Sequence, residues 1–186
     1  AQALLKSCRG FLHADAYAGF DKLYAPDPET GAPRLFEVAC WAHARREIFD
    51  EHARTKSPLA REILERIGEI FAIEREINGQ SAAERLAARQ ARSVPLLADL
   101  KAYLDTCLAR ISRKGDLAKA IRYSLTLWTA LNRFTEDGRL EMSNNAAERA
   151  IRPLTLGRRN WTFLGSDTGG DRAAVFYTII QTCKLN

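Results

Sequence analysis

The sequence predicts an α/β fold in which two short strands lie near the N-terminus, a long helical segment follows them, and further helices form the C-terminal part. Residues 1–40 contain two short strand-like segments, bounded by turn residues or followed by a helical pattern. Residues 57–134 show helical spacing of apolar side chains almost throughout. With 186 residues, 46% of them hydrophobic, the chain can bury one sizeable core and fits a single domain with an inserted subdomain.

The first strand is predicted at residues 11–15, where it follows the Arg9-Gly10 turn and ends in Asp15. An acid at the carboxyl end of a strand lies at the rim of a sheet, where side chains converge on a ligand. The alternative is that Asp15 is the N-cap of a following helix. A second strand is predicted at residues 33–40, and it runs directly into a helix over residues 41–49.

The central segment is predicted to form an inserted helical subdomain, with helices at residues 58–77, 81–93, 94–112 and 116–134. The breaks are indicated by Asn78-Gly79, by Pro95 at a first helical turn and by Lys114-Gly115-Asp116. The apolar residues of this segment fit a packed stripe, so they are assigned to the core. The predicted domains are residues 1–56, 57–134 and 135–186, of which the first and last form one core.

The C-terminal part begins with the motif Asn144-Asn145-Ala146-Ala147-Glu148-Arg149, in which Glu148 lies at the start of a predicted helix. No other acid lies between residues 149 and 160, whereas four arginines do: Arg149, Arg152, Arg158 and Arg159. A carboxylate beside that much positive charge can hold a divalent metal next to a bound phosphate backbone. The alternative is a capping box, with Asn145 as the N-cap and Glu148 at N3.

Two further features are predicted after Glu148. Pro153 is expected to end or kink the Glu148 helix. A glycine-rich turn at residues 165–171 lacks the lysine and the spacing of a P-loop, so nucleotide binding is not expected. The last helix is predicted at residues 172–183, capped by Asp171 or Thr168.

Positive charge is in modest excess, since 28 Lys and Arg stand against 23 Asp and Glu and give a formal charge of +5. Net charge of this size is weak evidence for a nucleic-acid partner. The distribution is more informative: arginines cluster at Arg45-Arg46, at Arg149 and Arg152, and at Arg158-Arg159, with Trp41 and Trp161 among them. Guanidinium groups bind phosphate and indoles stack on unpaired bases, so these clusters indicate DNA binding. The alternative is that the arginines are solvated faces of amphipathic helices.

Composition also limits the cellular location and the metal chemistry. No apolar run approaches the ~20 residues needed to cross a bilayer, so no membrane partner is expected. The four cysteines, at positions 8, 40, 107 and 183, form no Cys-x-x-Cys pair, which predicts reduced thiols in a cytoplasmic protein. Cys40 and His43 are half of a zinc ligand set, but no second pair stands at a suitable spacing, so structural zinc is not expected.

Three phrases resemble the insertion-sequence-66 family of bacterial transposases, in order over nearly the whole chain. They are residues 14–20, residues 40–46, and residues 144–149 through Arg158-Arg159-Asn160-Trp161. The family belongs to the DDE transposases. The resemblance implies a partial ribonuclease H-like fold, a mixed sheet with flanking helices and a large all-helical insertion. It also implies that Asp15 and Glu148 are catalytic and bind Mg²⁺ (or Mn²⁺), that the partner is DNA in a bacterial nucleoid, and that the active complex is a homo-oligomer.

The resemblance leaves one ligand without a counterpart, since the first catalytic aspartate of a DDE domain should precede Asp15 and none of residues 1–14 is acidic. The chain is therefore expected to be a piece of a longer enzyme with little activity alone. The Cys40-x-x-His43 step resembles a signature near the catalytic pocket of several DDE groups. This implies that His43 contacts DNA or orients the active site, whereas a structural histidine is the alternative. The alternatives for function are a noncatalytic helical DNA-binding or assembly fragment, and a nuclease not linked to transposition.

Overall fold

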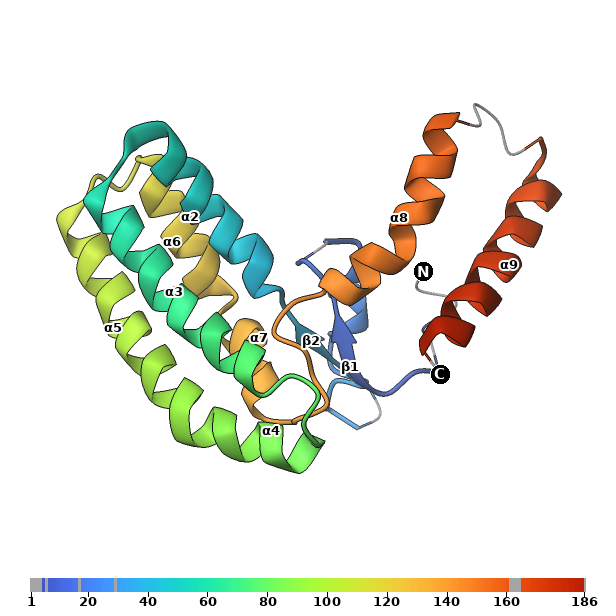
Figure 1. Cartoon of the computed structure of the whole chain (residues 1–186), viewed down its shortest axis with the longest axis horizontal. Coiled ribbons are helices and arrows are strands. Elements are labelled where there is room, and N and C mark those ends of the chain that lie inside the picture. Colours follow the sequence, from blue (N-terminus) through green and yellow to red (C-terminus); the bar gives the residue numbers. More distant parts are fainter. Residues whose placement is uncertain (1–4, 6, 17, 29, 161–164, 186) are drawn as a thin grey trace. The chain divides into compact units, whose positions relative to one another are not determined.

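The chain forms two compact units, residues 1–144 and residues 145–186, in the computed structural model. The structure describes residue 5 and residues 7–16, 18–28, 30–160 and 165–185. Figure 1 shows the elements of each unit in sequence colours. The first unit contains a small sheet and a bundle of helices, and the second contains two helices.

The sheet of the first unit is made of two parallel strands, β1 (Gly10–His13) and β2 (Leu35–Val38), paired from Gly10↔Leu35 to His13↔Val38. The connection between them includes the 3₁₀ helix η1 (Ala18–Leu23) and no described α-helix. Both predicted strands are confirmed, although β1 ends two residues before Asp15. Strands and helices together fit the predicted α/β class, whereas the ribonuclease H-like arrangement stays a prediction.

The helical bundle follows directly from β2. Its elements are α2 (Trp41–Thr55), α3 (Pro58–Glu76), α4 (Ala82–Ala88), the π-helical segment η2 (Arg89–Ser93), α5 (Val94–Arg110), α6 (Asp116–Thr126), α7 (Trp128–Asn132) and the 3₁₀ helix η3 (Arg133–Thr135). Figure 1 shows α2, α3, α5 and α6 side by side. Their inward faces form one core, to which α2 contributes Trp41 and Ile48, and α3 contributes Ile63 and Ile67. The predicted insertion therefore shares its core with α2, and the three-domain division stays a prediction.

One predicted helix boundary was confirmed and one predicted helix was divided. α5 begins at Val94 with Pro95 in its first turn, as predicted, and η2 joins it to α4 through an i→i−5 hydrogen bond from the Val94 N–H to the Arg89 carbonyl. A π-helical turn of this kind accommodates an interruption of the regular hydrogen-bond ladder. The predicted helix at residues 116–134 is divided at Leu127, whose ψ of 11° ends α6 before α7 begins.

The second unit contains α8 (Asn145–Asn160) and α9 (Asp167–Leu185). Pro153 lies inside α8, which bends in Figure 1 and continues to Asn160, so the proline kinks the helix without ending it. The last helix begins five residues earlier than predicted. Its cap is Ser166, whose hydroxyl accepts a hydrogen bond from the Gly169 N–H at 3.1 Å, and not Asp171 or Thr168.

No helix among the described residues combines the length and the hydropathy needed to cross a membrane. All four cysteines are free thiols, with Cys40 and Cys107 buried and Cys8 and Cys183 exposed.

Candidate functional site

Asp15 lies just beyond the carboxyl end of β1, at the rim of the sheet. The preceding residue, Ala14, donates its backbone N–H to the carbonyl of Val38 at 3.0 Å, so Asp15 is held at the end of both parallel strands. Its side chain is 47% exposed, and the Oδ2 atom lies 4.0 Å from Nε2 of His43. His43 belongs to the first turn of α2, which begins three residues after β2 ends. The strand end and the helix start therefore bring an acid and an imidazole together.

Asp15 and His43 line an open pocket of about 650 Å³, called here the acidic pocket. Its other lining residues are Glu47, Asp50, Glu51 and Arg54 of α2 and Asp116, Lys119, Ala120 and Tyr123 of α6. Positions 43, 47, 50, 51 and 54 form one stripe along α2, and positions 116, 119, 120 and 123 form one stripe along α6, as a 3.6-residue period requires. The pocket is thus the groove between two packed helices, with Asp15 as a contribution from the sheet.

The charges of the acidic pocket are paired at the end formed by Arg54. Its Nη2 atom lies 2.7 Å from Glu51 and 3.3 Å from Asp116, and Lys119 Nζ lies 2.8 Å from the other oxygen of Asp116. Two cations therefore offset two carboxylates there.

Negative charge dominates the rest of the acidic pocket. Within the described part of the chain, no lysine or arginine forms an ion pair with Asp15, Glu47 or Asp50. Burial raises the pKa of Tyr123, and the charges of Asp15 and Glu47 raise it further. Excess carboxylate of this kind attracts cations, and its oxygens are the ligands that hard divalent ions prefer.

The donor chemistry of this end fits a hard cation, but the ligand set is partial. Among the described residues, no three His, Cys, Asp or Glu side chains lie close enough together to hold a metal ion. Cys40 is 2% exposed and belongs to the core, at the N-cap position of α2, where its thiol makes no capping hydrogen bond. Asp15 is therefore the ligand candidate of this unit, with His43 beside it.

Glu148 lies in the first turn of α8 and is exposed. Together with Asn145, Arg149, Ile151, Arg152 and Thr155, it lines an open pocket of about 460 Å³ within the second unit. The helix begins at Asn145, which makes Glu148 its fourth residue, at the positive end of the helix dipole. This position favours a carboxylate at the helix start. Arg149 and Arg152 of the same helix line the pocket with Glu148.

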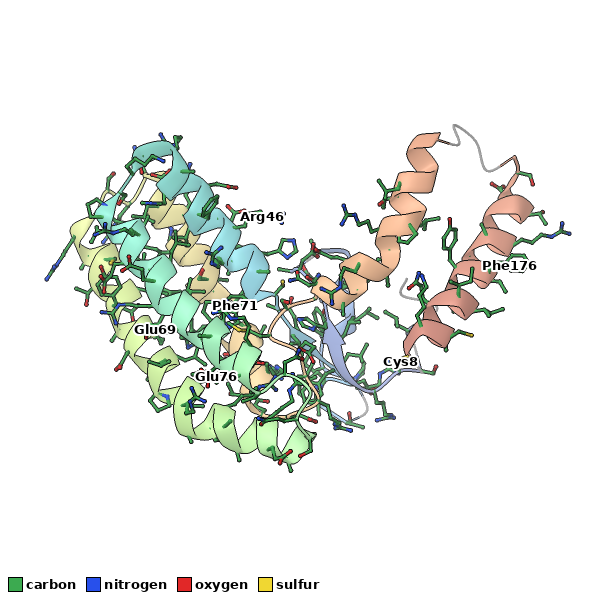
Figure 2. All side chains as sticks on the ribbon, in the orientation of Figure 1. Cys8, Arg46, Glu69, Phe71, Glu76 and Phe176 are labelled. Atoms are coloured by element: carbon green, nitrogen blue, oxygen red, sulfur yellow. The ribbon has the colours of Figure 1, made fainter. Side chains whose placement is uncertain are left out.

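The other predicted DNA-binding residues are distributed over both units. Arg45 and Arg46 are exposed on α2, where Figure 2 labels Arg46, and the guanidinium of Arg45 lies 5.9 Å from the ring centre of Phe49. Arg158 and Arg159 belong to the last turn of α8, and their side chains lie outside the described part of the structure. Trp161 also lies outside the described residues.

The suggestion that Trp41 stacks on an unpaired base was wrong. Its side chain is fully buried and packs edge to face against Trp128, with ring centres 5.7 Å apart. The sequence reasoning also missed Glu47, Lys119 and Tyr123 as pocket residues. The stripe of polar residues on α2 is visible in the sequence, but its meaning depends on α6 packing beside it.

Comparison with known proteins places the chain in a family. The model of the transposase IS66 family matches residues 1–172. Three similar proteins come from Sinorhizobium fredii (strain NBRC 101917 / NGR234). The uncharacterized protein y4hP is 44% identical, and the match covers 95% of this chain and 34% of y4hP. The uncharacterized protein y4jD is 40% identical, with 100% of this chain and 36% of y4jD covered. The uncharacterized protein y4qI is 39% identical, with 95% of this chain and 33% of y4qI covered.

The chain spans about a third of the length of these curated relatives. No solved structure matches it. Because the family model covers nearly all of the sequence, including the strand that leads to Asp15 and the helix that carries Glu148, the chain belongs to the transposase IS66 family.

Proposed function

We propose that this chain is part of the catalytic domain of a DNA transposase, which cuts DNA strands at the ends of an insertion sequence and joins them to target DNA. The match to the transposase family over residues 1–172 carries this proposal. The proposed domain has a ribonuclease H-like fold of the DDE type and acts on DNA as a homo-oligomer. The chain covers about a third of its relatives, so the activity belongs to a longer parent protein.

Asp15 and Glu148 are proposed to hold Mg²⁺ or Mn²⁺. Asp15 supports this role because its carboxylate is half exposed at the rim of the sheet, at the negative end of the acidic pocket. Glu148 supports it because its carboxylate shares a pocket with two arginines. Bound divalent ions supply an activated nucleophile at neutral pH and offset the charge that develops on the scissile phosphate. The two carboxylates are a partial ligand set, so further oxygen ligands come from the parent protein.

The remaining residues bind and orient the substrate in this proposal. His43, when protonated, attracts the Asp15 carboxylate and restricts its orientation, since the two side chains lie 4.0 Å apart. Arg149 and Arg152 donate hydrogen bonds to phosphate oxygens beside Glu148. Arg45-Arg46 on α2, and Arg158-Arg159 with Trp161, add sequence-independent contacts to the DNA backbone and to unpaired bases.

A noncatalytic assembly fragment is the second candidate function, and one observation favours it. Four large apolar side chains of α9 are between 48% and 65% exposed: Val175, Phe176, Ile179 and Ile180. Figure 2 labels Phe176 on this helix. Exposed apolar patches of this kind mark protein interfaces. In that case Glu148 serves only the start of α8, and the arginines only bind backbone phosphates.

Substitution of the two proposed metal ligands in the full-length parent separates these functions. Asp15→Asn and Glu148→Gln are expected to lower Mg²⁺-dependent cleavage of a duplex carrying the element end by several orders of magnitude, because neutral amides bind Mg²⁺ poorly. DNA binding and folding should persist. The matched control is Asp167→Asn, which removes an acid from the first turn of α9, as Glu148→Gln does from α8.

A purely structural role for Glu148 predicts a different pattern. Glutamine keeps most of the hydrogen-bonding ability at a helix start, so Glu148→Gln would then cost less than ~1 kcal/mol and leave cleavage near normal. Full cleavage activity in both the Asp15→Asn and Glu148→Gln parents would reject the catalytic proposal in favour of the assembly function.

A further inference from the structure

A second pocket of the first unit, about 270 Å³ in volume, lies where β2 meets the end of α6 and takes no part in the acidic pocket. The pocket is called here the base pocket, and its polar and aromatic residues are Tyr24, Phe36, Glu37, Thr126, Thr129 and Arg133. The volume is just below the ~300–1,000 Å³ of sites for drug-sized ligands, so it suits a smaller planar group.

Two donors of the base pocket are buried without a partner. The Tyr24 hydroxyl and the Arg133 Nε–H make no hydrogen bond among the described residues. A buried donor without an acceptor costs ~1–3 kcal/mol, and an acceptor group on a ligand in the pocket would offset that cost. The Arg133 guanidinium is fixed by the Phe36 ring, whose centre lies 5.3 Å from Cζ. This contact restricts the Arg133 donors before any ligand binds.

Glu37 adds an acceptor to the same pocket. Burial raises its pKa, the charge of Asp21 raises it further, and Arg133 opposes the shift. Burial also raises the pKa of Tyr24 to about 12, so its hydroxyl is a donor at neutral pH. One cation and one carboxyl group nearly offset each other, and the carboxyl group would repel a phosphate. The pattern of donors and an acceptor around an aromatic wall suits a nucleobase.

Guanine matches this pattern better than the other bases. Its O6 and N7 atoms are adjacent acceptors, which an arginine binds with two hydrogen bonds, and its N2 amino group is a donor for a carboxylate. The Tyr24 hydroxyl offers a further donor to the acceptor edge. An adenine would present its N6 amino group, a donor, to the donors of Arg133.

The base pocket lies next to the acidic pocket along α6. Tyr123 lines the acidic pocket, and Thr126, three residues later, lines the base pocket. Three helical residues correspond to ~4.5 Å along the helix axis. The two pockets are therefore neighbours along α6, so one DNA strand can contact both.

We propose that the base pocket binds an unpaired guanine of the DNA strand whose cleaved phosphate lies at the acidic pocket, with Arg133 on its O6 and N7 edge and Glu37 on its amino group. The placement beside the cleaved phosphate rests on the proposed function. The preference for guanine does not, because it is a property of binding that can be measured without cleavage.

The test uses the full-length parent and three single-stranded DNA probes. Each probe is a short, fluorescently labelled oligothymidylate with one different base at its centre. The central base is guanine in the first probe, hypoxanthine in the second and 7-deazaguanine in the third. Hypoxanthine lacks the amino group of guanine, and 7-deazaguanine lacks N7. Fluorescence anisotropy without divalent metal gives each Kd. The guanine probe should bind about tenfold more tightly than either analogue, since a good base contact contributes at least that factor.

Two variants assign the contacts. Arg133→Met should abolish the preference for guanine over 7-deazaguanine and keep the preference over hypoxanthine. Glu37→Leu should do the reverse. Arg122→Met and Glu136→Leu, which remove an exposed arginine and an exposed glutamate outside the pocket, should keep both preferences.

Equal Kd values for the three probes with the wild-type parent would overturn the proposal, whether or not the variants fold. Preferences that are unchanged in Arg133→Met and Glu37→Leu would also overturn it, because the guanine would then be recognised elsewhere. Cleavage that depends on Asp15, measured together with equal Kd values, would reject the base pocket and keep the transposase function. A guanine preference in a parent whose cleavage is insensitive to Asp15→Asn would keep the base pocket and reject the proposed role of Asp15 in cleavage.

Discussion

Replacing Arg89 with methionine is expected to destabilise the first unit by about 3–5 kcal/mol, because it breaks a buried ion pair. Arg89 belongs to the π-helical segment η2, and its side chain is fully buried. Its Nε and Nη2 atoms donate to the two carboxylate oxygens of Glu74 at 2.8 and 2.7 Å. Its Nη1 atom donates to the backbone carbonyls of Phe134 and Asp137 at 2.9 and 3.2 Å. One guanidinium thus ties α3 and η2 to the segment that leads toward α8.

The magnitude follows from what remains after the substitution. The Glu74 side chain is 11% exposed, so it would stay largely desolvated without its bidentate partner. Arg85 Nη2 lies 3.8 Å from the same carboxylate and would offset part of the loss. Two backbone carbonyls would also lose a donor, at a cost of ~1 kcal/mol or more each. Because these two effects oppose each other, the expected loss stays within about 3–5 kcal/mol.

The matched control is Arg92→Met in the same segment. Arg92 pairs with Glu76 at 2.7 Å, the same distance as the Arg89–Glu74 pair, but these two side chains are 47% and 58% exposed. An exposed pair contributes less than ~1 kcal/mol. Urea unfolding followed by circular dichroism compares the two variants directly. The double variant Arg89→Met/Glu74→Leu should regain much of the loss, because no unpaired charge then stays buried.

An Arg89→Met variant that loses no more stability than Arg92→Met would refute this reasoning. It would mean that the Glu74 carboxylate reaches water or another cation without Arg89. A double variant less stable than Arg89→Met would also contradict the argument, because the unpaired carboxylate would then not be the source of the loss.

Three further predictions follow from the described residues. Arg149→Ala and Arg152→Ala should each lower the slope of log Kobs against log salt for DNA binding by about 0.9, and an unchanged slope would assign them to folding. Burial raises the pKa of Glu37, so the stability that Glu37 contributes is complete below its unfolded pKa and is lost as pH rises through its folded pKa. The stability of Glu37→Gln relative to the wild type should therefore increase over this pH window, as measured by urea unfolding. Gly138→Ala should cost about 1–3 kcal/mol, because the added methyl group meets backbone atoms, whereas Gly68→Ala, with open space in α3, should stabilise by roughly 0.5–1 kcal/mol.

The order of elements in the first unit was predictable where local signals agreed. Residues around Phe11 and Phe36 are short apolar runs bounded by turns, and both form strands. Ser57 and Pro58 predict the start of α3, and the Ser57 hydroxyl accepts the Ala60 N–H as a cap. These signals act within a few residues, so a sequence contains all of the information that they require.

The start of α9 was predicted wrongly because it depends on a less common local signal. Gly169 and Gly170 were assigned to a turn because of their low helix propensity, yet the Ser166 cap stabilises a helix that begins before them.

The pockets were not predictable, because they depend on packing between distant segments. Asp15 was identified from its position at a strand end, but its neighbours Lys119 and Tyr123 come from a helix about a hundred residues later. No periodicity in α6 indicates that it packs on α2. The pocket at Arg133 was unpredictable for the same reason, because residues around β2 form about half of its lining and lie far from Arg133 in the sequence.

The most direct test of the catalytic assignment is the separation of the Asp15 and Glu148 carboxylates in a structure of the full-length parent bound to Mn²⁺ and to DNA carrying the element end. The anomalous signal of Mn²⁺ would identify the bound ions. Carboxylates that share a site should lie roughly 4–8 Å apart, as ligands around two ions ~3.5–4 Å apart must. Carboxylates more than ~15 Å apart in a well-ordered complex, with Mn²⁺ bound elsewhere, would contradict the assignment of Asp15 and Glu148 to one metal site.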